Sequence, residues 1–459
     1  MAAIKSGAVD MTSGPSLPLI LRFSLPILLG SLFQQLYTVV DGMVVGRQVG
    51  TEALAAVGVG FPITYMLTSI FLGLGLGASV LVSQHFGRRD MEGVRRVVGS
   101  MNAFLLISAV PLTLFGILTA GPFLRLLGTD AVLFDDAKLY MIIYYLGLLP
   151  QFGYNVNASV LQGIGDSQTP LVILIASSVL HIVLAVLLAV VLPLGVAGVA
   201  WSTVLSQLFS WALSQWFIGR KYPDVHVPLL KSRLHREAFG ATLKLGVPMG
   251  LQNALFSVGM MVMQPLINGQ GAVFIAGYNA AVKVDGFIFL PVSALAAAIT
   301  TFVGQNIGAG QPQRVREGIR ATSALAVGLC AILCAVVIPL RTVLMGLFTE
   351  DAAVVAAGNA YLLRVIPLYI ISTIQYMIIG VLRGAGQTVV PTVATLVSLW
   401  LARVPAAYLL TRYLGPDNMH WCYALGWVMG LCILIPYYYF GKWRKGLGEA
   451  ASAEPLPYE

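Results

Sequence analysis

The chain has 459 residues, of which 58% are hydrophobic and only 10% are charged. Soluble domains carry roughly 25% charged residues, so this composition excludes an ordinary soluble protein and predicts a chain that meets lipid over most of its surface. The formal net charge of +8 could suggest a nucleic-acid partner, but the basic residues lie in short connectors between apolar stretches, which is the pattern of a membrane topology signal.

Twelve apolar stretches follow one another along the chain, each long enough for a bilayer span, which needs about 20 residues. Because the stretches are long and lack strict alternation, we expect membrane-spanning helices rather than the strands of a barrel. The predicted spans are residues 18–45, 53–83, 94–120, 137–162, 169–192, 196–219, 239–268, 272–303, 316–340, 353–382, 389–411 and 420–441.

An even number of spans places both termini on the same side of the membrane. Most of the 27 Lys and Arg residues fall on that side, in the termini and in the connectors that share it. Because connectors rich in Lys and Arg stay in the cytoplasm, we expect a multi-pass protein of the cell (inner) membrane with both termini cytoplasmic.

The second half of the chain repeats the first at a spacing of about 221 residues, which is far too long for a solenoid repeat. Residues 161–165 (LQGIG) return as residues 382–386 (LRGAG), and Asp130 returns as Asp351. Duplicated membrane bundles of this kind are typical of transporters whose two halves rock around a central site.

The repeat predicts an all-α integral membrane fold with twelve transmembrane helices in two lobes of six. Because six is even, both lobes insert in the same orientation, and their pseudo-twofold axis should run along the membrane normal. The predicted parts are an N-terminal lobe at 1–219, a cytoplasmic linker at 220–238, a C-terminal lobe at 239–448 and a disordered tail at 449–459.

Asp41 is the most informative polar residue, because it lies inside the first predicted span. A carboxylate at the centre of a span costs on the order of 3 kcal/mol on insertion scales, so it should face the bundle interior or bind a cation or a proton. The alternative is an interfacial Asp near the outer end of the span. Tyr37 and Gln34 share its helical face at i−4 and i−7, and Pro26 offers a kink or a hinge.

His181 is the second candidate, in the fifth predicted span. It could titrate near neutral pH, or it could be a hydrogen-bonded core residue, and the sequence favours neither. Asn157, Thr203 and Gln207 could complete a polar pocket in the first lobe, although amides and hydroxyls also join helices within membranes.

The second lobe also carries polar residues within its predicted spans. They are candidates for lining a substrate cavity, together with Gln34 and Gln207 of the first lobe. These residues are Gln252, Gln264, Tyr278, Lys283, Asp285, Gln375 and Arg403.

Motifs of catalytic or nucleotide-binding sites are missing from the sequence. Residues 73–77 (GLGLG) look like a glycine fingerprint, but they lie within a span, where close helix packing explains them better. We therefore expect no enzyme activity, no cofactor and no metal site, and we expect an ion gradient to supply the energy.

Several motifs together resemble a known family. They are Pro26 with residues 36–37 (LY), 40–42 (VDG), 45–47 (VGR) and Gly50, then residues 82–87 (VSQHFG), 161–167 (LQGIGDS) and 382–386 (LRGAG). This set resembles the multidrug and toxic compound extrusion (MATE) transporters over about residues 18 to 442. The resemblance implies two lobes around a central cleft, and export of amphipathic, often cationic compounds in exchange for H⁺ or Na⁺.

The resemblance also implies which residues bind the coupling cation. Asp41 falls on the family's first-lobe carboxylate, with Tyr37, Asn157 and Thr203 on neighbouring positions, and His181 lies close to them. This makes Asp41 the predicted coupling residue.

Two departures from the family pattern bear on the coupling ion. Many members read Asn-Ile-Val-Leu-Asp where this chain has residues 181–185 (HIVLA), and members with a second-lobe sodium site carry Glu and Asp where Phe256 and Ser372 stand here. Sodium needs several oxygen ligands, so the loss of these oxygen-bearing side chains favours H⁺ over Na⁺ as the coupling ion. In this respect the chain resembles the DinF-like branch of the family.

The predicted function is therefore a secondary active antiporter that works by alternating access as a monomer in the lipid bilayer. Its expected partners are amphipathic small molecules and H⁺, less favourably Na⁺, with no nucleic acid. The alternative is a lipid-linked saccharide flippase of the same superfamily, which would need a more cationic cavity.

Overall fold

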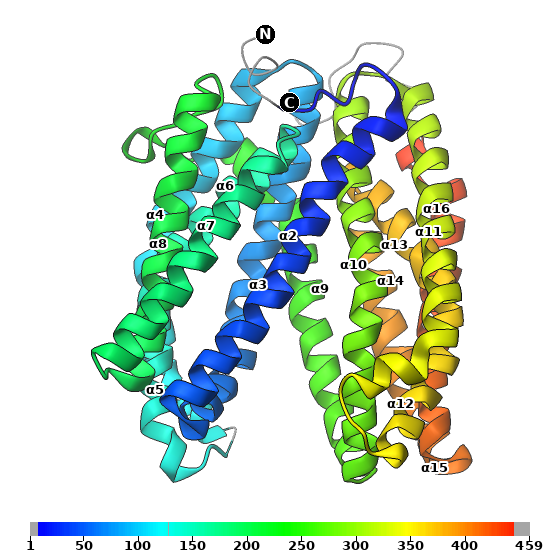
Figure 1. The fold of residues 1–459 in the computed structure, drawn as a ribbon. Helices are drawn as coiled ribbons and strands as arrows, with labels where there is room; N and C mark the ends of the chain where they lie inside the picture. Colours follow the sequence, from blue (N-terminus) through cyan, green and yellow to red (C-terminus); the bar gives the residue numbers. More distant parts are fainter. Residues whose placement is uncertain (1–7, 127, 445–459) are drawn as a thin grey trace. The chain divides into compact units, whose positions relative to one another are not determined.

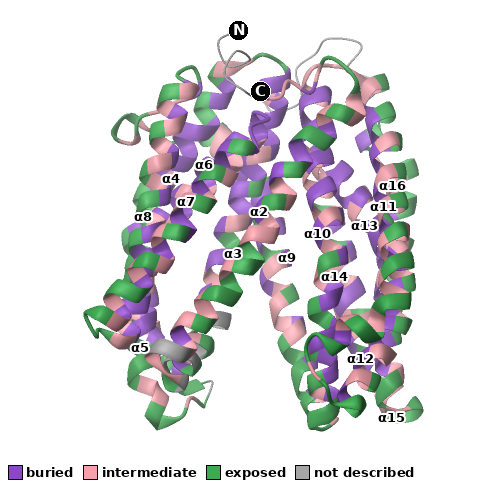
Figure 2. Ribbon diagram, in the orientation of Figure 1, coloured by how far each residue is buried: buried purple, intermediate pink, exposed green. Residues whose placement is uncertain are grey.

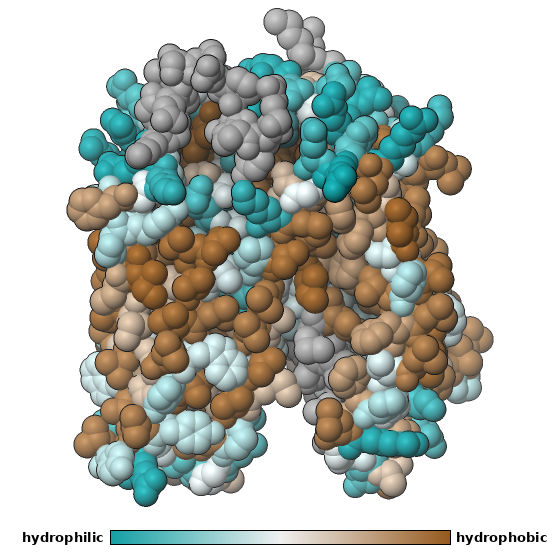
Figure 3. Space-filling view, turned by 180° about the vertical axis from the view of Figure 1, so that it is seen from behind, coloured by the Kyte–Doolittle hydropathy of each residue, from teal (hydrophilic) through white to brown (hydrophobic). Residues whose placement is uncertain are grey.

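The computed structural model describes residues 8–126 and 128–444, and every regular element in those ranges is a helix (Figure 1). Hydrophobic side chains cover the middle of the helices, and hydrophilic side chains gather toward their ends (Figure 3). The predicted all-α membrane fold is confirmed. The predicted tail at 449–459 lies outside the described residues.

The chain forms two compact units. The first contains the segment up to Asp10 and Leu25–Gly250, and the second contains Met11–Ser24 and the chain from Leu251 onward. The division falls within a helix rather than in the linker at 220–238, so the lobe boundaries read from the sequence stay a prediction.

The helices of the first half run in chain order with short connections. They are α2 (Ser16–Val44), η1 (Val45–Val49), α3 (Thr51–Gly87), α4 (Met91–Leu126), α5 (Ala131–Leu146), α6 (Leu148–Gly163), α7 (Gln168–Ala185), η2 (Val186–Val191) and α8 (Gly195–Lys221).

The helices of the second half follow a short turn, η3 (Leu229–Lys231). They are α9 (Arg236–Asn268), α10 (Ala272–Gly308), α11 (Pro312–Gly346), α12 (Ala352–Val365), η4 (Ile366–Leu368), α13 (Tyr369–Gly384), α14 (Val389–Val397), η5 (Ser398–Arg403), α15 (Val404–Leu414), η6 (Pro416–Trp421) and α16 (Cys422–Phe440).

Among the described residues, eleven helical segments are long and apolar enough to cross a membrane. The remaining predicted span, 137–162, is broken at Gly147 into α5 and α6, each of 16 residues. Pro150 explains the break, because a proline nitrogen cannot donate the hydrogen bond to the carbonyl of Leu146 four residues earlier. Pro367 within η4 breaks the corresponding span of the second unit.

The breaks free backbone carbonyls, which cannot be left unpaired away from water. In the first unit, the hydroxyl of Thr113 on α4 donates to the carbonyl of Tyr145 at 3.0 Å. In the second unit, the thiol of Cys334 on α11 donates to the carbonyl of Ile366 at 3.2 Å. The two contacts occupy equivalent positions of the sequence repeat, so the repeat extends to the way in which each break is held.

The same repeat governs how helices pack. Gly163 of α6 lies against the carbonyl of Ser79 on α3, and its counterpart Gly384 of α13 lies against the carbonyl of Thr300 on α10. Asp130 and Asp351 both cap helices, since each side chain accepts from the backbone N–H two residues later. The sequence repeat is therefore a structural repeat.

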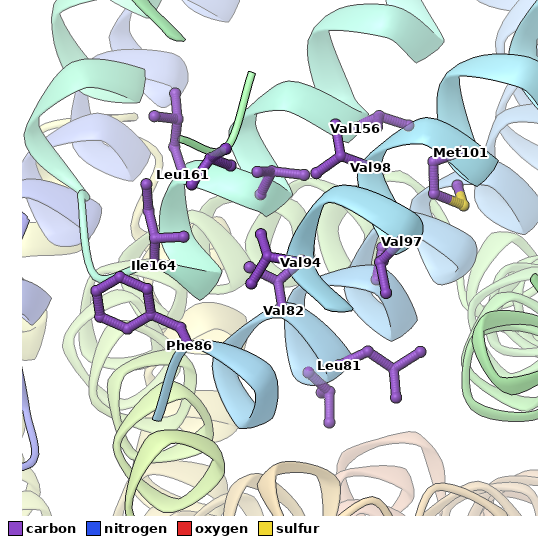
Figure 4. Packing of buried hydrophobic residues seen from close by; sticks show 14 of the residues in the cluster. Leu81, Val82, Phe86, Val94, Val97, Val98, Met101, Val156, Leu161 and Ile164 are labelled. Carbon is purple, nitrogen blue, oxygen red and sulfur yellow. The ribbon is translucent and has the colours of Figure 1, made fainter. Parts of the chain in front are cut away.

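A buried apolar cluster joins α3, α4 and α6 in the first unit (Figure 4). Phe86, Val94 and Leu161 meet within it, and none is more than 1% exposed. Leu245 and Met249 of α9 belong to the same cluster. The first part of α9 thus packs within the first unit, while the outward faces of α4 and α8 remain exposed (Figure 2).

Glycines allow α9 to lie directly on α3. A Cβ atom placed at Gly73 would lie 2.2 Å from the backbone nitrogen of Gly250, and one at Gly77 would lie 2.7 Å from the nitrogen of Gly246. No side chain fits between backbones this close. The glycine-rich residues 73–77 therefore serve close helix packing, as the sequence indicated.

Asp166 fixes the connection between α6 and α7. Its carboxylate accepts hydrogen bonds from Lys221 Nζ at 2.7 Å and Tyr222 Oη at 2.6 Å, and from the backbone and side chain of Thr169. Burial alone would raise the pKa of Asp166, but the hydrogen bonds from Lys221, Thr169 and Tyr222 hold this pKa below its usual value.

The α3–α9 contact predicts opposite effects for two substitutions in one helix. Gly246→Ala would place a Cβ 2.6 Å from Leu74 Cα, whereas Gly240→Ala meets nothing within 4 Å. Overpacking typically costs about 1–3 kcal/mol, so Gly246→Ala should lower the thermal unfolding midpoint of the purified protein. Gly240→Ala should leave it unchanged or raise it, because alanine favours a helix by up to about 1 kcal/mol. Equal thermal unfolding midpoints for the two variants would contradict the close contact between α3 and α9.

Asp166 predicts a pH-dependent loss of stability. Removing one partner of a buried pair costs about 3 kcal/mol or more, so Asp166→Asn should lower the unfolding midpoint at neutral pH. Because the folded-state pKa lies below the unfolded value of about 3.9, the stabilisation is complete above that value and disappears as the pH falls through the folded-state pKa.

Thermal unfolding of wild type and Asp166→Asn in detergent at neutral and acidic pH tests this. The gap between the two midpoints should narrow on acidification. Asp130→Asn is the matched control, because Asp130 is an exposed helix cap and Asn caps equally well. A gap that is constant across the pH range would show that the Asp166 charge does not stabilise the fold.

Candidate functional site

Asp41 lies near the end of α2, just before the π-helical turn η1. Its side chain is 29% exposed. Its Oδ1 atom is buried and has no hydrogen-bond partner among the described residues. A carboxylate in this state favours any group that can bring a proton or a positive charge to that oxygen.

His181 of α7 lies beside that oxygen. Its Nδ1 atom lies 3.5 Å from Asp41 Oδ1 and 2.8 Å from the hydroxyl of Tyr37. Tyr37 and Asp41 occupy positions i and i+4 of α2, so both side chains face α7. The rings of Tyr37 and His181 meet edge to face, with centroids 5.2 Å apart.

The other ring nitrogen of His181 faces two hydroxyls of α8. Nε2 lies 3.2 Å from Ser202 Oγ and 3.1 Å from Thr203 Oγ1. Both hydroxyls already donate to the carbonyl of Val199, so each can only accept from the ring. From this pattern we assign the proton of the neutral imidazole to Nε2, which leaves Nδ1 to accept from Tyr37.

This tautomer determines what the site can do chemically. A second proton on the ring can only go to Nδ1, which is the atom that faces the Asp41 carboxylate. Asp41 and His181 are then two adjacent proton acceptors.

The structure brings four predicted site residues together and places a fifth elsewhere. Asp41, Tyr37, His181 and Thr203 form one contact network. Asn157 is buried in another contact, where it donates to Ser214 at 2.7 Å and accepts from Gln215 at 3.3 Å.

The remaining candidates of the first half are not part of this network. Gln34 is exposed on α2, and Gln207 of α8 is half-buried with an Oε1 atom that has no partner among the described residues. Pro26 lies inside α2, two residues after the point where the chain passes between the compact units.

In the second unit, Asp285 of α10 is buried among tyrosines. Tyr361 of α12 donates to its Oδ2 atom at 2.8 Å, while Oδ1 is buried without a partner among the described residues. The hydroxyls of Tyr278 and Tyr423 lie 2.7 Å apart, and the Arg403 guanidinium lies 3.8 Å from the centroid of the Tyr423 ring. These residues form an enclosed polar centre.

The other second-half candidates are dispersed. Gln252 of α9 donates to Thr395 at 2.9 Å and accepts from Arg383 at 3.0 Å. Gln264 is exposed and bonds Asn268, and Lys283 is exposed with its ammonium 5.8 Å from the Phe348 ring. Gln375 is buried on α13.

Sequence reasoning missed Ser202, Tyr361 and His420. Ser202 precedes a predicted site residue, and that adjacency was the available signal. His420 is 1% exposed in η6 and stacks against Phe274 with centroids 5.6 Å apart. The sequence around Tyr361 and His420 does not mark them, because the residues that they contact lie far away along the chain.

Comparisons with known proteins agree with this fold. A family model described as MatE matches the chain twice, over residues 26–187 and 248–409. The probable multidrug resistance protein YpnP of Bacillus subtilis (strain 168) is 31% identical over 438 residues, which are 95% of this chain and 98% of that protein.

More distant relatives extend the likeness. The multidrug export protein MepA of Staphylococcus saprophyticus is 22% identical over 409 residues, which are 87% of this chain and 88% of that protein. A crystal structure of a MATE protein in the bent conformation has a TM-score of 0.88 at 23% identity, with 97% of this chain and 99% of that chain covered.

The chain is thus a multi-pass membrane transporter and not an enzyme. It belongs to the MATE family, as the double match of the family model and the YpnP relative show. The placement in the DinF-like branch stays a prediction.

The assigned tautomer of His181 is testable by nitrogen-15 NMR of histidine-labelled protein. At neutral pH the His181 signals should report a protonated Nε2 and a bare, hydrogen-bonded Nδ1. Tyr37→Phe removes the donor to Nδ1, so the Nδ1 signal should shift while the Nε2 signal does not. His181→Asn identifies the signals among the five histidines. A protonated Nδ1 in wild type would refute the assignment.

Proposed function

We propose that the protein is a proton-driven antiporter that exports amphipathic, often cationic small molecules. The contact of Asp41 Oδ1 with His181 Nδ1 carries the proposal, because it places two acceptors for one proton inside a membrane helix bundle. The names of its relatives, which refer to multidrug resistance and multidrug export, support the class of substrate.

Coupling follows from charge. With Asp41 ionised and His181 neutral, the site holds one negative charge in a medium where an unpaired charge is costly. A cationic substrate or a proton can neutralise that charge, but both together would leave an excess positive charge. Proton and substrate therefore exclude each other, which is the condition for exchange.

The ligand chemistry favours the proton over sodium. Sodium is a hard cation that takes several oxygen ligands. His181 presents a nitrogen to Asp41, and Ala185, one helical turn further along α7, offers no side-chain oxygen. A ring nitrogen that can itself be protonated suits a proton better than a metal ion.

The remaining parts of the proposal concern access and orientation. Exchange requires that the site open to one side of the membrane at a time, and the two repeated units support such alternating access. We place both termini in the cytoplasm and the protein in the inner membrane, on the distribution of Lys and Arg. The cavity residues named from the sequence remain candidates for substrate contact within each unit. A saccharide flippase is less well supported, because Lys283 is exposed and Arg403 stacks on Tyr423.

Asp41→Asn should abolish export driven by a proton gradient while keeping the fold. The substitution removes the charge and keeps the shape, so efflux of a cationic dye from proteoliposomes should fall to the rate of empty vesicles. Asp130→Asn, an exposed cap, is the control and should export at the wild-type rate. Wild-type efflux by Asp41→Asn would place the coupling residue elsewhere.

The same assay separates the two ions. Wild-type efflux should follow an imposed pH gradient and ignore a sodium gradient. His181→Asn combined with Ala185→Asp restores two oxygen-bearing side chains on one face of α7, so it should introduce a response to sodium. A wild-type response to sodium alone would overturn proton coupling while leaving the transporter assignment intact.

A further inference from the structure

A cavity of about 650 Å³ opens between the start of α4 and the segment that links α8 to α9. The whole cavity belongs to the first unit. Its volume lies within the range of small-molecule sites. It is lined by Met91, Glu92, Arg95, Arg96, Gly99, Asp224, Val227, Lys231, Arg233 and His235.

The lining carries excess positive charge. Arg96 pairs with Glu92, one helical turn away on α4. Asp224 is the other carboxylate of the lining. Arg95, Lys231 and Arg233 form no ion pair among the described residues, so their charges are available to an anion entering the cavity.

Specific contacts hold the linking segment in place over α4. The amide of Asn102 donates to the carbonyl of Val227 at 3.3 Å, and the backbone N–H of His235 donates to Ser100 Oγ at 3.0 Å. Asn102 and Ser100 are both buried, and Val225 of the segment is fully buried in the core of the unit. The cavity wall is therefore a built part of the fold.

The same segment exposes leucines beside its cations. Leu230 is 97% exposed in the turn η3, and Leu234 is 42% exposed. Burying a leucine side chain in an apolar medium is favourable, so two exposed leucines between basic residues favour a site at the membrane surface. Trp216 is exposed near the end of α8, and the Arg220 guanidinium lies 5.6 Å from the centroid of its ring. Because tryptophan favours the boundary between membrane and water, Trp216 also places this region at the membrane surface.

We propose that this cavity binds the phosphate headgroup of an anionic membrane lipid. Arg95, Lys231 and Arg233 would contact the phosphate, and Leu230 and Leu234 would enter the acyl region. Free phosphate esters share the headgroup chemistry, but they offer nothing to the two leucines. The site is separate from Asp41 and His181, and it stands whether or not the protein exports protons.

Native mass spectrometry of the purified full-length protein tests the proposal. The probes are phosphatidylglycerol, phosphatidylcholine and glycerol 1-phosphate, each titrated against the same preparation. Phosphatidylglycerol should bind more tightly than phosphatidylcholine and remain bound when glycerol 1-phosphate is in excess.

Arg95→Gln, Lys231→Gln and Arg233→Gln together should weaken phosphatidylglycerol binding about a hundred-fold. The matched control removes three exposed charges outside the cavity, through Arg316→Gln, Arg320→Gln and Lys442→Gln, and should bind as wild type does. Equal losses in the two triple variants would overturn the site, because only total charge would then matter.

Leu230→Ser distinguishes a lipid from a soluble ester. It should weaken phosphatidylglycerol binding and leave the weak binding of glycerol 1-phosphate unchanged. An unchanged affinity for phosphatidylglycerol, or its displacement by equimolar glycerol 1-phosphate, would show that the cavity takes a soluble phosphate compound and would overturn the lipid assignment. Unfolding midpoints equal to wild type confirm that each variant is folded.

Discussion

The direct contact of helix backbones at the α3–α9 crossing is the constraint on which the first unit depends. Lipid offers no hydrophobic drive for helices to associate, so they must gain contact by approaching closely. Gly73 and Gly77 on one helix, with Gly246 and Gly250 on the other, permit that approach. The crossing brings Leu245 and Met249 into the apolar cluster that holds α3, α4 and α6, and α6 in turn leads to the Asp166 connection at the start of α7. α7, which carries His181, continues from this connection and packs along α8.

Much of the fold could be predicted because hydropathy and repetition are properties of the chain itself. The spans follow from apolar length, and the equivalence of Gly163 with Gly384 follows from the repeated motif. The break at Gly147 could not be read from hydropathy, because both halves of that span are apolar. Pro150 was the available signal, but a proline within a span is often only a kink.

The sequence predicted most residues of the site, but it did not predict which of them contact one another. Asp41 and His181 stand out because charge and imidazole are rare in apolar helices. Asn157 could not be separated from them by sequence, since one amide in a helix serves equally well in a site or between helices. The rotation of α6 decides the matter, and it turns Asn157 toward Ser214. The tautomer of His181 depends on Ser202 and Thr203, whose hydroxyls are already committed to Val199.

The two repeated units hold their broken spans with different atoms. A hydroxyl is a strong hydrogen-bond donor, whereas a thiol is a weak one. Thr113 therefore clamps the carbonyl of Tyr145 more firmly than Cys334 clamps that of Ile366. The two copies of the repeat thus differ in the strength of one hydrogen bond at the same point, and we expect bending of the span to require less energy in the second unit than in the first.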